Sequence, residues 1–381
     1  MRDRDAPPAR PRRRLTYTPD AVGRGSAGAD GRARMLRLLL LALVVAGLTP
    51  GTFVRTPTGL RSDVAVVSVT PLPTREGVSG DLTLTGTWEL KAGHGWFGGF
   101  SALVAGDADG AMLLAGTDRG LLLDLDISGD APRAVPRTFR PFSRRSAGRK
   151  EVVDLEALTR DPDTGTVWAA FENANQITRL ARDGTRSTRA PDAMAQWSAN
   201  SGPETMIRLA DGRFLVIAEG TIRGSDTAHE ALLFAGDPVE TGAPQVFRFV
   251  APHDYDPVDA TQVPDGRVLI LLRRVGYDIP ARFDTAIAVA DPRRIRAGQP
   301  WHARIIQRLG GGIFADNFEG LAFVPSAQDQ SQGSLWLISD DNFSVFQRSL
   351  LVRFDWDGKA IRDDDDNRTE HNEKAPGNPD A

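Results

Sequence analysis

The sequence contains no cysteine, and only five of its 381 residues are histidines. The lack of cysteine excludes disulfide bonds, thiolate metal sites and a cysteine nucleophile. The histidines do not have the spacing of a zinc motif such as H-E-x-x-H, which argues against a zinc enzyme. A G-x-S-x-G nucleophile elbow is missing too, so nothing supports an α/β-hydrolase. These motifs identify no catalytic side chain, and any chemistry has to rest on oxygen ligands.

The chain also lacks a strong excess of charge. Its formal net charge of −4 gives no reason to expect nucleic acid as a partner. A hydrophobic fraction of 41% and a charged fraction of 25% are typical of a globular protein. The 38 glycines and 25 prolines, with many glycines in Asp-Gly pairs, favour short strands joined by tight turns. We expect one large all-β unit that is a monomer.

The two ends of the chain differ in composition from the part between them. Residues 1–34 are rich in Arg, Pro and Gly; we expect a disordered extension, with translation truly starting at Met35. Residues 35–51 hold Arg37, an apolar run too short to span a bilayer, and a Thr-Pro-Gly break, as in a signal peptide. At the other end, residues 361–381 are expected to form a disordered acidic tail.

This N-terminal pattern predicts where the protein works. A cleaved signal peptide would place it in the periplasm or outside the cell. No small-x-small cleavage site is visible, so an uncleaved anchor in the inner membrane, with the protein facing the periplasm, stays open. The membrane is a partner only in that second case.

Residues 60–360 alternate short apolar strands with turn signals and show no long helical period. Five strand–turn–strand units begin near Gly98, Glu151, Gly202, Asp256 and Ala315. Segments 64–71 and 82–90 could form a sixth unit, closed by strands from the C-terminal end. The sequence therefore predicts an all-β fold, a β-propeller with six blades, with five blades as the alternative.

An acidic residue recurs at the start of four of these units, in Glu156, Glu204, Asp259 and Glu319. The gaps of about 48, 55 and 60 residues are in the range of propeller blades. Because the first strand of each blade lines the central channel, we expect the four carboxylates to converge there. With Asp154 and Asp340 they would offer the oxygen ligands that Ca²⁺ prefers, and Mg²⁺ is not excluded. The alternative for each acid is to cap backbone N–H groups or to pair with arginine.

Some basic residues are candidates for holding an anionic substrate. Arg119, beside Asp118, could bind such a substrate through its forked guanidinium, or the two could form a simple turn with an ion pair. The arginine-rich segment 133–150 could attract phosphate or be a solvated insertion, and the same alternatives apply to Arg273 and Arg274.

Six short segments occur together in an order found in one known family. They are Gly98–Ala102, Asp118–Gly120, Leu155–Leu158, Asn200–Glu204, Phe318–Ala322 and Leu337–Asn342. Over about residues 77–356 the chain resembles the phytase-like domain, whose members are described as "esterase-like activity of phytase". The resemblance implies an exported bacterial propeller with phosphoesterase or esterase activity and calcium dependence. The Asp-Ala-Asp-Asp-Pro type segment of the calcium-dependent β-propeller phytases is missing, so their catalytic residues are not carried over.

These observations together lead to one functional hypothesis and two alternatives. The hypothesis is an exported Ca²⁺-assisted hydrolase of phosphate esters, in which metal-activated water attacks a small anionic substrate. One alternative is a non-catalytic propeller that binds a ligand or partner around a structural cation. The other is a lactonase-like hydrolase of carboxylic esters.

Overall fold

The computed structural model describes most of the chain between residues 66 and 361, together with a short stretch near the N-terminus. The described ranges are 35–40, 66–73, 77–106, 110–142, 154–252, 254–276, 282–344 and 346–361. Residues 1–49 and 50–381 form two separate units. In the first unit residues 35–40 are helical with exposed side chains. The predicted extension 1–34, most of the predicted signal 35–51 and all but the first residue of the predicted tail 361–381 lie outside the described residues. No described helix has the length and apolar character needed to cross a membrane.

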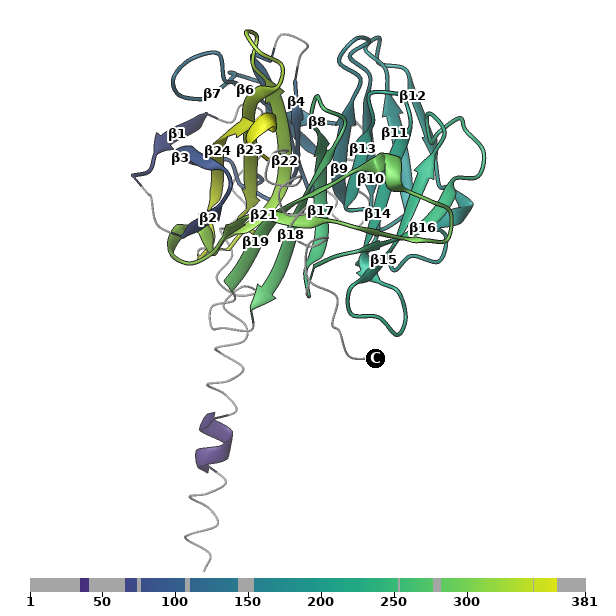
Figure 1. Ribbon diagram of the computed structural model, residues 1–381. Helices are drawn as coiled ribbons and strands as arrows, with labels where there is room; N and C mark the ends of the chain where they lie inside the picture. The colour runs from purple at the N-terminus through teal and green to yellow at the C-terminus, as the bar shows by residue number, and fades with distance from the viewer. Residues whose placement is uncertain are drawn as a thin grey trace, which may run out of the picture. The chain divides into compact units, whose positions relative to one another are not determined.

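The second unit is a β-propeller, and its described strands form five sheets, which we number as blades in chain order (Figure 1). Blade 1 contains β4 (Phe100–Ala105), β5 (Met112–Thr117), β6 (Leu121–Asp126), β7 (Arg133–Ala134) and β8 (Arg140–Pro141). Blade 2 contains β9 (Leu155–Arg160), β10 (Val167–Phe171), β11 (Gln176–Leu180) and β12 (Arg186–Arg189). Blade 3 contains β13 (Thr205–Arg208), β14 (Phe214–Thr221), β15 (Ala228–Phe234), β16 (Gln245–Val250) and β20 (Pro300–His302). Blade 4 contains β17 (Asp256–Gln262), β18 (Val268–Gly276), β19 (Arg282–Ala290), β21 (Arg304–Leu309) and β2 (Val78–Gly80). Blade 5 contains β22 (Asn317–Pro325), β23 (Gln332–Asp340), β24 (Ser349–Asp357), β3 (Thr83–Ala92) and β1 (Val67–Pro71).

The first strands of the five blades form a closed ring around the channel. Strand β4 lies against β9 and β22, β9 against β13, β13 against β17, and β17 against β22. Each first strand pairs antiparallel with the second strand of its own blade. The predicted propeller, with first strands lining one axis, is confirmed.

The two ends of the propeller domain complete the same blade. Strand β3 pairs with β24, and β1 then pairs with β3, so that the N-terminal strands lie beside the C-terminal ones in Figure 1. The predicted pairing of the ends is confirmed. The segments expected to build a sixth blade are instead outer strands of blade 5, and β2 is an outer strand of blade 4. The described sheets therefore number five, the alternative, because the N-terminal strand material extends existing blades.

Apolar side chains fill the spaces between neighbouring blades. The largest group lies between blades 4 and 5 and includes Leu271, Ile287, Leu337 and Phe354, all with no exposed surface. Trp168 and Trp336 are 5% and 2% exposed, as expected of core residues. This packing makes the wedge between two sheets, rather than the channel, the main source of hydrophobic stabilisation.

Turns and short helices connect the strands. Gly184, Gly212 and Gly266 have φ between 87° and 90°, so these Asp-Gly turns have the backbone that the sequence predicts. Asp357-Gly358 differs, since residues 358–361 form a helical turn. The connections within the described residues also contain the 3₁₀ helices η1 (Asp192–Met194), η2 (Pro292–Arg294) and η3 (Gly312–Phe314).

Candidate functional site

The first strands of the blades share an irregularity near their N-terminal ends. Strand pairing shifts by one residue at Ser101 in β4, Glu156 in β9, Val258 in β17 and Glu319 in β22. Such a bulge leaves one residue out of the ladder and redirects its side chain. Glu204, just before β13, occupies the matching place in blade 3. Three of the five blades thus put a glutamate at this position.

The second strands bring a further side chain from each blade to the same end of the channel. In each blade, one residue of the second strand pairs with the residue just after the bulge position of the first strand. Two positions further along the chain lie the residues Asp118, Glu172, Glu219, Arg273 and Asp340, in blades 1 to 5 respectively. Four of these five are acids and one is arginine. We call the seven acids from both positions, with Asp154 and Arg273, the acidic end of the channel.

Two groups of three carboxylates form the centre of this end. One carboxylate oxygen each of Asp154, Glu156 and Glu172 lie within 4.8 Å of one another. The same is true of Glu172, Glu204 and Glu219, so Glu172 belongs to both groups. All donors are carboxylate oxygens, the type that fits Ca²⁺ or Mg²⁺ and not a soft metal.

Neighbouring polar groups hold two of these acids in place. The Asn173 Nδ2 amide donates a hydrogen bond of 3.0 Å to Asp154 Oδ2. The Gly202 backbone N–H donates a bond of 3.1 Å to Glu172 Oε1. A Cβ on Gly202 would lie 2.9 Å from Glu172 Cγ, so glycine is needed for this close approach.

Arg273 is the counter-charge on the other side of the acidic end. Its guanidinium pairs with Glu319, donates to Glu219 Oε1 at 2.5 Å, and lies 3.7 Å from Glu204 Oε2. Nη1 also donates to Asn317 Oδ1 at 3.0 Å. Burial lowers the pKa of Arg273, but the three carboxylates outweigh it and raise the pKa, so the residue stays charged. It thereby connects blades 3, 4 and 5.

Several acids of this end are hard to ionise, including Glu204 beside Arg273. Burial, and then the charges of Glu204, Glu319, Asp154 and Asp118, raise the pKa of Glu156 well above its usual value. Burial and nearby acids also raise the pKa of Asp340 well above normal. For Glu204 burial and Glu219 raise the pKa while Arg273 lowers it, and the net direction is upward. A bound cation on the Glu156 side would reverse this penalty.

Asp259 does not belong to the acidic end, although the sequence pattern suggested it. It follows the bulge residue Val258, so it is one position out of register with Glu156 and Glu319. Its Oδ2 accepts the Leu321 N–H at 2.7 Å and its Oδ1 accepts the Ala260 N–H at 2.8 Å. The alternative of capping backbone N–H groups therefore describes Asp259, and we leave it out of the candidate cation site.

The rim of the acidic end contains the residues proposed for substrate binding. Asp118 is 7% exposed and raises the pKa of Glu156 and Asp340, so it acts as one of the acids. The Arg119 guanidinium stacks on the Phe343 ring, with 3.8 Å from Cζ to the ring centroid. Phe343 has φ of 50°, unusual for an aromatic residue, and its N–H donates to Asp341 Oδ1 at 3.0 Å. The structure thus keeps both Asp118 and Arg119 at this end of the channel.

Several functional positions were not recognised from the sequence. Glu172 follows β10 and Glu219 lies in β14, both of which the sequence marked only as second strands, and Arg273 had the same two alternatives as the adjacent Arg274. Their signal is the shared position in the second strand, which needs the register to be seen. Arg274, by contrast, pairs with Asp284 on the surface. The part of the basic segment 133–150 beyond residue 142 lies outside the described residues.

A buried histidine contacts the backbone of one of the acids of this end. His229 has no exposed surface, and its Nδ1–H donates to the Glu219 backbone carbonyl at 2.7 Å. Burial lowers the pKa of His229, so the ring is neutral. It helps to fix the backbone that carries the Glu219 carboxylate.

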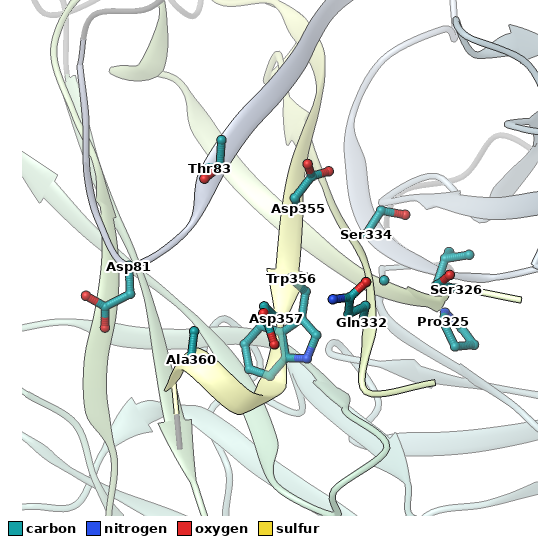
Figure 2. A pocket seen from close by; sticks show the side chains of 12 residues that line it. Asp81, Thr83, Pro325, Ser326, Gln332, Ser334, Asp355, Trp356, Asp357 and Ala360 are labelled. Atoms are coloured by element: carbon teal, nitrogen blue, oxygen red, sulfur yellow. The ribbon is translucent and has the colours of Figure 1, made fainter. Parts of the chain in front are cut away.

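A cavity of about 570 Å³ lies elsewhere, lined by residues of β22, β23, β24 and β3 of blade 5 (Figure 2). Asp81, Thr83, Asp355 and Trp356 line it, and none of the acidic-end residues does. Its three carboxylates, from Asp81, Asp355 and Asp357, lie apart from one another in Figure 2. This cavity therefore lacks the converging groups that the acidic end has.

Comparison with known proteins gives one family and several distant structures. The family model "Phytase-like: Esterase-like activity of phytase" matches residues 95–343. No curated protein matches the chain. A streptogramin B lyase structure matches with a TM-score of 0.35 and 11% identity, over 78% of this chain and 100% of that one. The β-propeller domain of Cps50 (Swd1) from Myceliophteria thermophila matches with a TM-score of 0.33 and 9% identity, over 79% of this chain and 98% of that one. Virginiamycin B lyase from Staphylococcus aureus matches with a TM-score of 0.30 and 12% identity, over 76% of this chain and 99% of that one.

Proposed function

The chain belongs to the phytase-like family, "esterase-like activity of phytase", and we propose on this basis that it is a Ca²⁺-assisted hydrolase of phosphate esters. The observation that carries the proposal is the pair of carboxylate groups that share Glu172 at one end of the channel. A cation held by carboxylates of this kind would stabilise the charge that develops on a phosphoryl oxygen during hydrolysis.

The acids would have different roles, which depend on whether they pair with Arg273. Asp154, Glu156 and Glu172 would hold the cation, because Arg273 already pairs with Glu204 and Glu219 on the other side. A bound Ca²⁺, or Mg²⁺ in its place, supplies Lewis acidity toward a phosphoryl oxygen and toward the attacking water. Without such a cation, the buried carboxylates would repel an anionic substrate.

Two residues at the rim would deal with the substrate itself. Arg119 presents a flat cation stacked on Phe343 and would orient the phosphate group of the substrate. Asp340 has a raised pKa, and its Oδ1 accepts the Asn342 N–H at 2.6 Å. Its Oδ2 would therefore carry the proton that the leaving oxygen takes up.

We propose export as the setting for this chemistry. The apolar segment between residues 35 and 51 would act as the signal, and the protein would work in the periplasm or outside the cell. An uncleaved segment would instead keep it on the inner membrane, facing the periplasm.

One observation favours a non-catalytic alternative. Arg273 of blade 4 contacts acids of blades 3 and 5, so a charge at this end already serves to connect blades. A cation among Asp154, Glu156 and Glu172 could do the same and leave the protein a binding propeller. A lactonase-like hydrolase of carboxylic esters would use the same acids with another substrate.

A hydrolysis panel separates these functions. Phosphomonoesters, phytate, carboxylic esters and lactones are each incubated with the protein in Ca²⁺ and in EGTA. We expect Ca²⁺-dependent release of phosphate, lost in Glu172→Gln and kept in Glu240→Gln, whose side chain is 64% exposed on an outer surface. Calcium binding without turnover on any substrate would support the binding propeller. Turnover of carboxylic esters or lactones alone would identify the second alternative.

A further inference from the structure

The channel has a second, chemically different end. A cavity of about 470 Å³ is lined by residues from the C-terminal halves of all five first strands, including Leu103, Leu158, Ile207, Ala260 and Leu321. The acids lie at the N-terminal ends of the same strands. Because equivalent strands run in the same direction around the axis, this cavity lies at the opposite end of the channel.

A tightly packed layer separates the two ends. The Asp259 carboxylate of blade 4 accepts an N–H from Leu321 in blade 5. Burial raises the pKa of Asp259 well above its usual value, and backbone N–H groups, among them that of Leu103 in blade 1, partly offset this rise. A Cβ on Gly320 would lie 2.9 Å from both the Ala102 carbonyl carbon and Leu103 Cβ, so no side chain fits there. A ligand in the second cavity would therefore not contact the acidic end.

Most polar groups of the second cavity are already bonded within the protein. Thr159 Oγ1 accepts the Arg208 N–H at 2.9 Å, and Thr261 Oγ1 accepts the Phe323 N–H at 3.2 Å. Gln262 accepts from the Ala210 N–H and donates to the Gly266 carbonyl. These bonds leave a mainly apolar wall of leucine, isoleucine, valine and phenylalanine.

Arg160 is the half-buried exception in this cavity, whereas Asp163, which also lines it, is exposed to solvent. The Arg160 Nε is buried and donates no hydrogen bond, and no described acid forms an ion pair with its guanidinium. The neighbouring Arg208 is neutralised by Asp161, with 3.5 Å between Nη2 and Oδ2. A buried guanidinium N–H without an acceptor is costly, and an incoming anion would remove that cost.

We propose that this second cavity binds a small amphipathic carboxylate. Its apolar body would lie against Leu103, Leu158, Ile207 and Leu321, and its carboxylate would accept hydrogen bonds from Arg160. The volume is within the usual range of small-molecule sites, and a few polar groups in an apolar wall are typical of them. The site is independent of the proposed hydrolysis.

The test compares ligands with the same apolar chain and different head groups. Octanoate, octanol, octylamine and acetate are titrated by calorimetry into the full chain. We expect octanoate to bind at least about tenfold more tightly than octanol, the worth of one charge-assisted hydrogen bond. Octylamine and acetate should bind more weakly still, because one carries the wrong charge and the other lacks the apolar body.

Variants test the position of the site. Arg160→Gln should reduce octanoate affinity to that of octanol, and Ala210→Trp, at an exposed residue of the cavity mouth, should abolish binding of both. Arg294→Gln removes an arginine of η2 whose side chain is 84% exposed and should change nothing. Glu156→Gln, at the acidic end, should leave octanoate binding intact. Absence of octanoate binding, or equal loss in the Arg160 and Arg294 variants, would overturn the proposal.

Discussion

Replacing Arg273 with methionine removes the arginine that pairs with three acids of the channel while keeping a side chain of similar length. The guanidinium contacts Glu319, Glu219 and Glu204, and all four side chains are between 13% and 16% exposed. Removing one partner from such a buried pair costs about 3–5 kcal/mol, because the remaining charge has no counter-ion. We therefore expect the variant to lose about 3–5 kcal/mol of unfolding free energy at pH 7 without calcium.

The pH dependence of this loss gives its physical cause. The pKa values of Glu156, Glu204 and Asp340 are already raised in the folded protein, so the stability that their protonated forms contribute is present below about pH 4 and lost as pH rises. Without Arg273 the pKa of Glu204 should rise further. The difference between variant and wild type should therefore shrink as pH falls toward 4.

Urea unfolding followed by tryptophan fluorescence at pH 4.5, 6 and 8 measures these effects. Arg274→Met is the matched control, because Arg274 is the next residue and its pair with Asp284 is 41% and 46% exposed. Such a surface pair is worth about 0–1 kcal/mol. Arg273→Lys serves if the methionine variant does not fold. An Arg273 variant as stable as the Arg274 variant, or a loss that stays constant with pH, would refute the role assigned to Arg273.

Further changes test other parts of the channel. Glu156→Gln removes one of the mutually repelling acids, so it should raise the unfolding free energy without calcium by about 1 kcal/mol and reduce the extra stability that calcium gives. Thermal unfolding with and without Ca²⁺ measures both effects. An unchanged stabilisation by calcium would show that Glu156 does not belong to the cation site. Asp259→Ala leaves the Leu321 N–H without its acceptor, at a cost of about 1–3 kcal/mol, while calcium binding by calorimetry stays normal; weaker binding would return Asp259 to the site. Burial raises the pKa of Asp316 to about 7, so the stability it contributes is lost between about pH 4 and 7, and Asp316→Asn should flatten the stability profile there; an unchanged profile in urea titrations contradicts the shift.

The repeat was readable from the sequence because a propeller uses the same strand start in every blade. Glu156 and Glu319 are bulge residues, and the spacing found them. Asp259 looked equivalent because it is acidic and at the right distance, but a difference of one residue moves a side chain to another environment. Spacing along the chain does not resolve one residue, whereas the pairing of β17 with β18 does.

The number of blades could not be predicted for a related reason. Segments 67–71 and 83–92 have the composition of ordinary strands, and nothing in them distinguishes an outer strand of blade 5 from half of a new blade. That choice depends on non-local pairing of β3 with β24, between residues more than 250 positions apart. The same holds for Glu172 and Glu219, which become part of the site only when β10 and β14 pair with their first strands.

The electrostatics of the acidic end follow from one blade that departs from the repeat. Blade 4 places Val258 at the first position and Arg273 at the second, where blades 2 and 3 place two acids each. Its positive charge therefore pairs with the neighbouring acids of blades 3 and 5 and partly offsets the burial that raises the pKa of Glu204 and Glu319. In blade 2 the pKa of Glu156 is raised by burial and by the charges of Glu204, Glu319, Asp154 and Asp118. A divalent cation gains most where this repulsion is greatest, and for this reason the group of Asp154, Glu156 and Glu172 is the place to look for it.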